Sequence, residues 1–151
     1  MLSAAEVMTR NVFTLPGSLS VSGAIWALMH RGVSGAPVRD GDGNLVGVVS
    51  EADLLEARGP GQEDVVDEAR GDDCVANAMT PALVAVGPNE PVDEVVALMV
   101  SHAVRRVLVL DDQGRLAGII TPIDVLRALA DGRLQPTRDL GWLADHFAPG
   151  P

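Results

Sequence analysis

Two stretches decide the fold of this chain: GVVSEAD at residues 47–53 and GIITPID at residues 118–124. Both have the form Gly, two apolar residues, Ser or Thr, two further residues and Asp. In both, a run of apolar residues suited to a strand gives way to a sequence suited to a helix. Because the two stretches lie at a fixed offset, the rest of the chain can be compared with itself at that offset.

The comparison aligns the two halves of the chain without a gap at an offset of 71 residues, the difference between positions 8 and 79. Elsewhere one apolar residue mostly replaces another. We therefore expect two fused, similar halves. The identical pairs include Met8-Thr9 and Met79-Thr80, Val21 and Val92, Val33 and Val104, Val38 and Val109, Asp40 and Asp111, Gly43 and Gly114, Leu45 and Leu116, Gly47 and Gly118, Asp53 and Asp124, and Leu55 and Leu126.

Each half is predicted to form a strand, a helix, two strands and a second helix. Asp/Gly-rich loops at 40–44 and 111–115 indicate hairpins between the last two strands. The fold class is therefore α/β, in the α+β sense, with the β-α-β-β-α order occurring twice. The expected elements span 12–15, 21–29, 36–39, 45–49 and 50–58, and then 83–86, 92–100, 107–110, 116–120 and 121–131.

The first helix of each half carries one apolar stripe, at spacings i, i+3, i+4, i+7 and i+8. Met29 and Met99 lie on these stripes, so we expect both in the core. The stripe positions are Val21, Ala24, Ile25, Leu28 and Met29, and Val92, Val95, Val96, Met99 and Val100.

The repeat sets the expected domain limits: a first unit at 1–58, a second unit at 74–131, and a tail at 132–151. The segment 59–73 is rich in Asp and Glu and is predicted to be a solvated acidic linker. In the tail, apolar residues predict a short docked helix; they are Trp142, Leu143 and Phe147.

Composition excludes several classes of partner. Hydrophobic residues make up 47% of the 151 residues and aromatic residues only 3%, which predicts a globule packed from aliphatic side chains. The formal net charge of −10 disfavours nucleic acid and anionic membrane surfaces, because both are bound through Lys and Arg. A small phosphorylated ligand needs only one local basic patch, so it remains compatible with this charge.

Cysteine and histidine content gives no sign of a redox or metal site. Cys74 is the single cysteine, which fits a reducing compartment. His30, His102 and His146 do not form a spaced ligand set with it, and no nucleophile arrangement is present. We expect neither a secretory signal nor a membrane span, because residues 1–11 contain no long apolar run and the sequence contains no run of about 18 apolar residues. We expect a cytoplasmic protein that is not an enzyme, with no metal and no obligatory cofactor.

The repeated motif has two interpretations. Ser50 with Asp53, and Thr121 with Asp124, have the spacing of a capping box, and Pro122 suits a first helical position. A helix N-terminus with a hydroxyl also suits a phosphate, and a carboxylate one turn later can accept from ribose hydroxyls. The motif glycine lets another chain segment or a ligand approach the backbone. Both interpretations can hold at once.

The chain resembles a known family, the tandem CBS-domain pair or Bateman module. The resemblance covers about residues 5 to 130 and rests on the duplicated element order, both Gly-x-x-Ser/Thr-x-x-Asp motifs, the Met-Thr pairs and residues 33–38. It implies two units related by pseudo-twofold symmetry, with two clefts between them. It also implies a ligand such as AMP, ADP, ATP or S-adenosylmethionine, and a homodimer.

The resemblance also implies roles for individual residues. One departure from the family pattern is Leu108, where the family often has proline. The implied ligand-binding residues are Asp53 and Asp124 for ribose hydroxyls, Ser50 and Thr121 for phosphate, and, for adenine, the backbone of Gly35, Ala36, Pro37, Arg106, Val107 and Leu108, with Thr14 near the base.

The two halves differ at one informative place. Arg105-Arg106 in the second half aligns with Ser34-Gly35 in the first. The arginine pair has two interpretations, an exposed strand edge or a clamp for phosphate oxygens. The clamp predicts that the second cleft favours phosphorylated ligands.

Two functions from different classes follow. The first is a ligand-sensing regulatory module that acts in trans on an effector protein, in which binding favours one packing of the halves over another. The alternative is a ligand-free dimerisation or protein-interaction module, whose function lies in an exposed surface.

Overall fold

The computed structural model describes residues 1–59 and 74–141. The chain divides into two compact units, one of Phe13–Leu83 and one of Met1–Val12 together with Val84–Pro151. We refer to them as the Asp53 unit and the Asp124 unit. The predicted acidic linker and the predicted tail helix around Trp142 lie outside the described residues. None of the helices in the described ranges is long and apolar enough to cross a bilayer.

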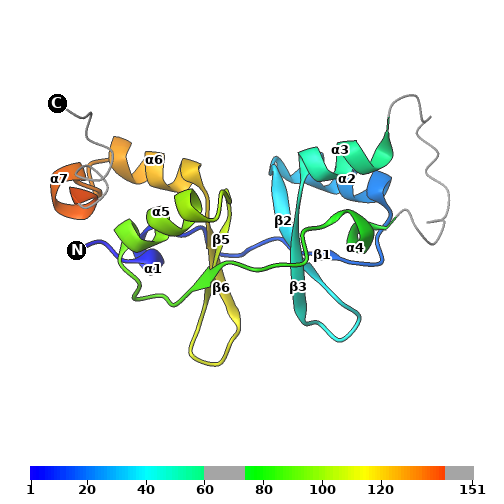
Figure 1. The fold of residues 1–151 in the computed structure, drawn as a ribbon, viewed down its shortest axis with the longest axis horizontal. Coiled ribbons are helices and arrows are strands. Elements are labelled where there is room, and N and C mark those ends of the chain that lie inside the picture. The colour runs from blue at the N-terminus through cyan, green and yellow to red at the C-terminus, as the bar shows by residue number, and fades with distance from the viewer. Residues whose placement is uncertain (60–73, 142–151) are drawn as a thin grey trace. The chain divides into compact units, whose positions relative to one another are not determined.

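The Asp53 unit contains one three-stranded sheet in the order β1-β2-β3. Strand β2 pairs in parallel with β1 and antiparallel with β3. Figure 1 shows helices α2 and α3 together on one face of this sheet, where a buried aliphatic core fills the space between them. The elements are β1 Leu15–Pro16, α2 Val21–Arg31, β2 Gly35–Arg39, β3 Leu45–Ser50, α3 Glu51–Arg58 and α4 Val75–Ala78.

The Asp124 unit repeats this arrangement with a sheet in the order β4-β5-β6. Its core lies between the sheet and helices α5 and α6, and it also includes residues of α1. The elements are α1 Ala4–Val7, β4 Ala85–Val86, α5 Val92–Ser101, β5 Val107–Leu110, β6 Leu116–Ile120, α6 Pro122–Ala130 and α7 Pro136–Asp139. The predicted α/β class and the predicted order of elements are therefore confirmed in both units.

Both predicted hairpins are confirmed, and their repeated aspartates have a structural reason. Asp40 Oδ1 accepts from the backbone N–H groups of Asp42 and Asn44, each at 2.9 Å. Asp111 Oδ1 accepts in the same way from Gln113 and Arg115, each at 2.9 Å. Each carboxylate therefore closes its own loop, as turn aspartates commonly do.

Two details of the secondary structure differ from the prediction. Helices α1 and α4 were not expected, because four residues are too short to show a helical period. Strands β1 and β4 have only two paired residues each and are shorter than predicted, and β1 runs one residue past its predicted end, to Pro16.

Met29 was predicted in the core, and this is wrong: 74% of it is exposed. Its repeat partner Val100 is also exposed, whereas Met99 is buried as predicted. At 3.6 residues per turn, position i+8 lies roughly 80° around the helix from position i, at the margin of the stripe. Both units leave this margin uncovered.

The opening segment of each repeat packs on the sheet of the other repeat. Thr9 exchanges both backbone hydrogen bonds with Ile119, at 2.8 and 3.0 Å. Thr80 exchanges the same two bonds with Val48, at 2.9 and 3.0 Å. Because of this exchange, Met1–Val12 belongs to the Asp124 unit, and the residues near position 80 belong to the Asp53 unit.

The motif glycines make this packing possible. A Cβ on Gly47 would lie 2.5 Å from the carbonyl oxygen of Thr80, and a Cβ on Gly118 would lie 2.9 Å from that of Thr9 and against the sulfur of Met8. Of the two partners expected at the motif glycine, a chain segment or a ligand, the structure therefore has a chain segment.

Replacing Gly47 with alanine is expected to destabilise the fold by about 1 to 3 kcal/mol, because a backbone carbonyl must move to admit the methyl group. Urea denaturation measures this change. Gly41→Ala is the matched control, since nothing lies within 4 Å of the Cβ that it would add. Equal midpoints for the two variants would contradict the close approach.

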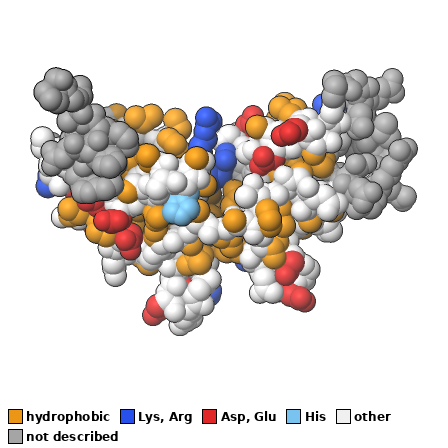
Figure 2. Space-filling view, in the orientation of Figure 1, with side chains coloured by type: hydrophobic (Ala, Val, Ile, Leu, Met, Phe, Trp, Pro, Cys, Tyr) orange, Lys and Arg blue, Asp and Glu red, His pale blue; other side chains and the backbone are white. Residues whose placement is uncertain are grey.

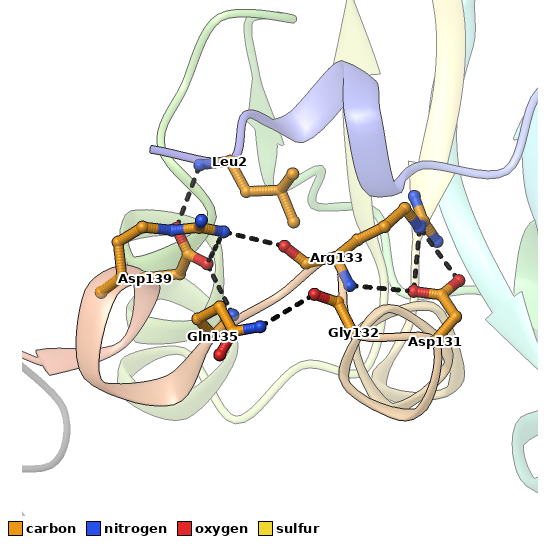
Figure 3. Close-up of polar contacts among 7 residues, drawn as sticks. Leu2, Asp131, Gly132, Arg133, Gln135 and Asp139 are labelled. Atoms are coloured by element: carbon orange, nitrogen blue, oxygen red, sulfur yellow. Dashed lines mark hydrogen bonds and ion pairs between the residues drawn. The ribbon is translucent and has the colours of Figure 1, made fainter.

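The N-terminus is fastened by the segment that follows α6. Asp139 is fully buried, and its carboxylate accepts from the backbone N–H of Leu2 at 3.2 Å and of Gln135 at 2.7 Å (Figure 3). Arg138 binds the same carboxylate through two nitrogens, at 3.0 and 2.7 Å. Arg133 donates to the carbonyl of Glu6 at 2.6 Å. The segment thereby holds α1 at both ends.

These donors hold the pKa of the Asp139 carboxyl far below its ordinary value, and the hydrogen bonds from Arg138 have the largest effect. A depressed carboxyl pKa stabilises the folded state above the unfolded value of about 3.9, and this stability is lost as the pH falls below that value.

Asp139→Ala is expected to lower the free energy of unfolding by about 2 kcal/mol near neutral pH, because buried backbone N–H groups lose their acceptor. The difference from the wild type should shrink as the pH falls below about 4. Chemical denaturation at several pH values measures both effects. The control is Asp112→Ala, in an exposed hairpin loop, which should cost little. A pH-independent difference would contradict this role of Asp139.

Candidate functional site

The motif of the Asp53 unit lies where β3 passes into α3. Ser50 is the N-cap of α3, and its hydroxyl oxygen accepts from the Asp53 backbone N–H at 3.1 Å. Asp53 Oδ2 accepts in return from the Ser50 backbone N–H at 2.9 Å. The capping-box interpretation is therefore confirmed here. The second oxygen of Asp53 takes no part in the cap.

The motif of the Asp124 unit also forms a capping box at the start of α6, with Pro122 in the first turn as predicted. Asp124 Oδ2 accepts from the Thr121 backbone N–H at 2.8 Å. The Thr121 hydroxyl donates to the same oxygen at 3.0 Å. Asp124 Oδ2 therefore accepts two hydrogen bonds from Thr121, whereas Asp53 Oδ2 accepts one from Ser50.

In the Asp53 unit the sheet brings the other predicted residues to the motif. Gly35 pairs directly with Ser50, and the neighbouring pairs are Ala36 with Val49 and Pro37 with Val48. Thr14 precedes β1, and β1 pairs in parallel with β2 from Leu15 opposite Val38, so Thr14 lies at the level of Pro37. The residues predicted from the first half thus share one region of one unit.

The Asp124 unit assembles its predicted residues in the same way. Val107 pairs with Ile120 and Leu108 with Ile119. Arg106 immediately precedes Val107, and Thr121 immediately follows Ile120, so the two residues lie at the same end of this strand pair.

Arg105 and Arg106 directly precede β5, the central strand of its sheet, so neither residue lies on an edge strand. Arg105 is exposed and Arg106 is half-buried. The register places the backbone of Arg106 beside Thr121, at the N-terminus of α6. A helix N-terminus already favours an anion, and guanidinium groups add to that preference.

Two residues contact Asp124 that sequence reasoning did not assign to the site. The Thr9 hydroxyl donates to Asp124 Oδ1 at 2.6 Å, and Arg127 Nη1 lies 3.5 Å from the same oxygen. Asp124 is only 4% exposed, whereas Asp53 is half-buried. Among the described residues no corresponding bond joins the hydroxyl of Thr80 to Asp53. The recurrence of Met-Thr in both halves was the available signal for Thr9.

Comparison with known proteins agrees with this architecture. The CBS domain profile matches residues 4–59 and again 75–131. An uncharacterized protein of Methanocaldococcus jannaschii is 28% identical over 96% of this chain, which spans 46% of that relative.

Solved structures agree as well. CBSX2 of Arabidopsis thaliana, solved in complex with AMP, is 30% identical with a TM-score of 0.73, over 89% of this chain and 100% of that one. A CBS domain pair in complex with 5′-methylthioadenosine and S-adenosyl-L-methionine is 25% identical with a TM-score of 0.72, over 89% of this chain and 99% of that one. The chain therefore belongs to the CBS-domain family and carries a tandem pair of these domains.

Proposed function

We propose that the chain is a regulatory module that binds an adenosyl nucleotide at its Ser/Thr-x-x-Asp motifs and acts in trans on an effector protein. The observation that carries this proposal is the motif itself, which occurs twice at a helix start with its carboxylate in the first turn. The two CBS pairs solved with AMP and with S-adenosyl-L-methionine support the ligand class.

In this proposal each motif residue has a defined role. Asp53 accepts from the two ribose hydroxyls through its free oxygen, and Ser50 and the first N–H groups of α3 face the phosphate or its replacement. The backbone of β2 from Gly35 to Pro37 contacts the adenine, with Thr14 nearby. Thr121, Asp124 and residues 106–108 have the corresponding roles in the other unit.

The arginine pair distinguishes the two motifs. Arg105 and Arg106 precede β5 beside Thr121, where the first half has only Ser34-Gly35. We infer that the Asp124 unit prefers phosphorylated ligands, and the Asp53 unit a less charged adenosyl group.

A thermal-shift panel tests the proposal with AMP, ADP, ATP, S-adenosylmethionine and adenosine, and with GMP as the control for the base. A ligand at 100 times its dissociation constant should stabilise the protein by about 2.7 kcal/mol. Asp53→Asn, which keeps the shape of the side chain, should reduce the shift. If no adenosyl compound raises the melting temperature, the proposal fails, and the ligand-free interaction module becomes the better description.

The same assay separates the arginine clamp from general binding. Replacing Arg105 and Arg106 together with alanine should weaken AMP and ATP binding more than adenosine binding, because only the first two ligands carry phosphate. Equal losses for all three ligands would contradict the clamp.

We also propose that the module is a homodimer that works in the cytoplasm. Apolar side chains lie exposed on helices of both units, and Figure 2 shows hydrophobic side chains at the surface. Such surfaces mark protein interfaces. A half-exposed free cysteine, Cys74, fits a reducing compartment. The exposed residues are Trp26, Met29, Leu55, Val100, Ile123 and Leu126.

Sedimentation velocity tests the dimer. The wild type should sediment as a dimer, and Leu55→Asp with Leu126→Asp should shift it to a monomer, because buried charges at an apolar interface lack partners. Gln113→Asp, in an exposed hairpin loop, is the control for an added surface charge. A monomeric wild type would contradict the proposal.

A further inference from the structure

Three of the acceptor positions of Asp124 are filled by hydrogen bonds from the protein itself. A carboxylate has about four lone-pair positions. Oδ2 accepts from the N–H and the hydroxyl of Thr121, and Oδ1 accepts from the Thr9 hydroxyl at 2.6 Å and lies 3.5 Å from Arg127. A ribose presents two neighbouring hydroxyls, so it needs two of these positions. Asp124 cannot accept both hydroxyls while its present donors remain.

Asp53 is different although its motif is the same. Its Oδ2 accepts from the Ser50 backbone N–H, and the Ser50 hydroxyl binds the Asp53 backbone instead of the carboxylate. Within the described ranges no donor reaches Asp53 Oδ1. This carboxylate keeps room for a diol without any rearrangement.

Of the donors to Asp124, Thr9 is the one that comes from a distant part of the chain, 115 residues away. It is held there firmly. Its backbone makes both bonds to Ile119, and the preceding segment is anchored through Ala4 N–H to Glu90 at 2.8 Å and Val92 N–H to Leu2 at 2.9 Å. Asp139 fastens the same segment at Leu2 (Figure 3), and Arg133 fastens it at Glu6. The Thr9 hydroxyl is therefore fixed opposite Asp124 Oδ1, where a ribose hydroxyl would otherwise bind.

We propose that Thr9 is a built-in competitor for the ribose, which keeps the Asp124 motif closed until a ligand displaces its hydroxyl. The proposal rests on the proposed function. A ligand at Asp53 meets no such competitor, whereas a ligand at Asp124 must first break a short, charge-assisted hydrogen bond. Such bonds are among the stronger ones in proteins. Thr9 thus sets the ligand concentration at which the Asp124 motif is occupied. As the ligand concentration rises, the Asp53 motif is occupied first and the Asp124 motif second.

The test isolates the Asp124 motif by working in an Asp53→Asn background. Isothermal titration calorimetry with AMP compares Asp53→Asn alone with the same variant carrying Thr9→Val, which keeps the side-chain shape and removes the donor. Adding Thr9→Val should tighten AMP binding about tenfold or more, the size expected for a hydrogen bond to a charged group. Thr80→Val is the matched control and should change nothing. Adding Asp124→Asn to the Thr9→Val variant should abolish the gain.

A second readout needs no ligand. Thr9→Val should lower the urea midpoint relative to Thr80→Val, because only Thr9 donates to a buried carboxylate. Equal urea midpoints for Thr9→Val and Thr80→Val would contradict the competitor role of Thr9. Equal AMP affinities with and without Thr9→Val, in a protein whose wild type binds AMP, would also contradict that role and leave the proposed function intact. Absence of AMP binding in every variant and in the wild type would overturn the proposed function, and the competitor with it.

Discussion

The fold depends on a close approach between backbones at two glycines. At Gly47 and Gly118 a strand meets a chain segment from the other repeat at a distance that leaves no room for a side chain. The two bonds that each threonine makes there, Thr9 with Ile119 and Thr80 with Val48, extend each sheet by one bridging residue. The same contact puts the threonine next to the helix start that follows the strand. The contact between the threonine segment and the strand therefore both packs the unit and shapes the surroundings of the motif.

The motif aspartate stabilises a helix and, in the proposed function, also binds a ligand. In both units the carboxylate closes a capping box, so its orientation is fixed before any ligand arrives. Preorganisation of this kind reduces the entropic cost of binding. The two units differ in what surrounds the cap: Asp53 is half-buried, and Asp124 is almost completely buried beneath Thr9 and Arg127. Identical motifs can therefore differ in function because of residues outside the motif.

Local pattern was sufficient to predict the element order, the hairpins and both capping boxes. These features depend on neighbours within a few residues, so a period of two or 3.6 residues or a turn signal reveals them. Met29 was misplaced because spacing alone does not say how wide a stripe the neighbouring elements cover. The bond between Thr9 and Asp124 joins residues 115 positions apart, and no local period reports a contact of that range. The position of the arginine pair beside Thr121 needed the strand register as well.

The exchange of opening segments also affects the order in which the chain can fold. Residues 1–12 leave the ribosome before residues 13–83, yet they belong to the unit whose remaining residues begin at Val84. The unit of Phe13–Leu83 is continuous, so it can complete its sheet while the rest of the chain is still being made. Domains generally fold as units during synthesis, and contacts between distant residues form more slowly. Residues 1–12 are therefore made well before their partners, which are residues 88–92, then strand β6, and then Asp139.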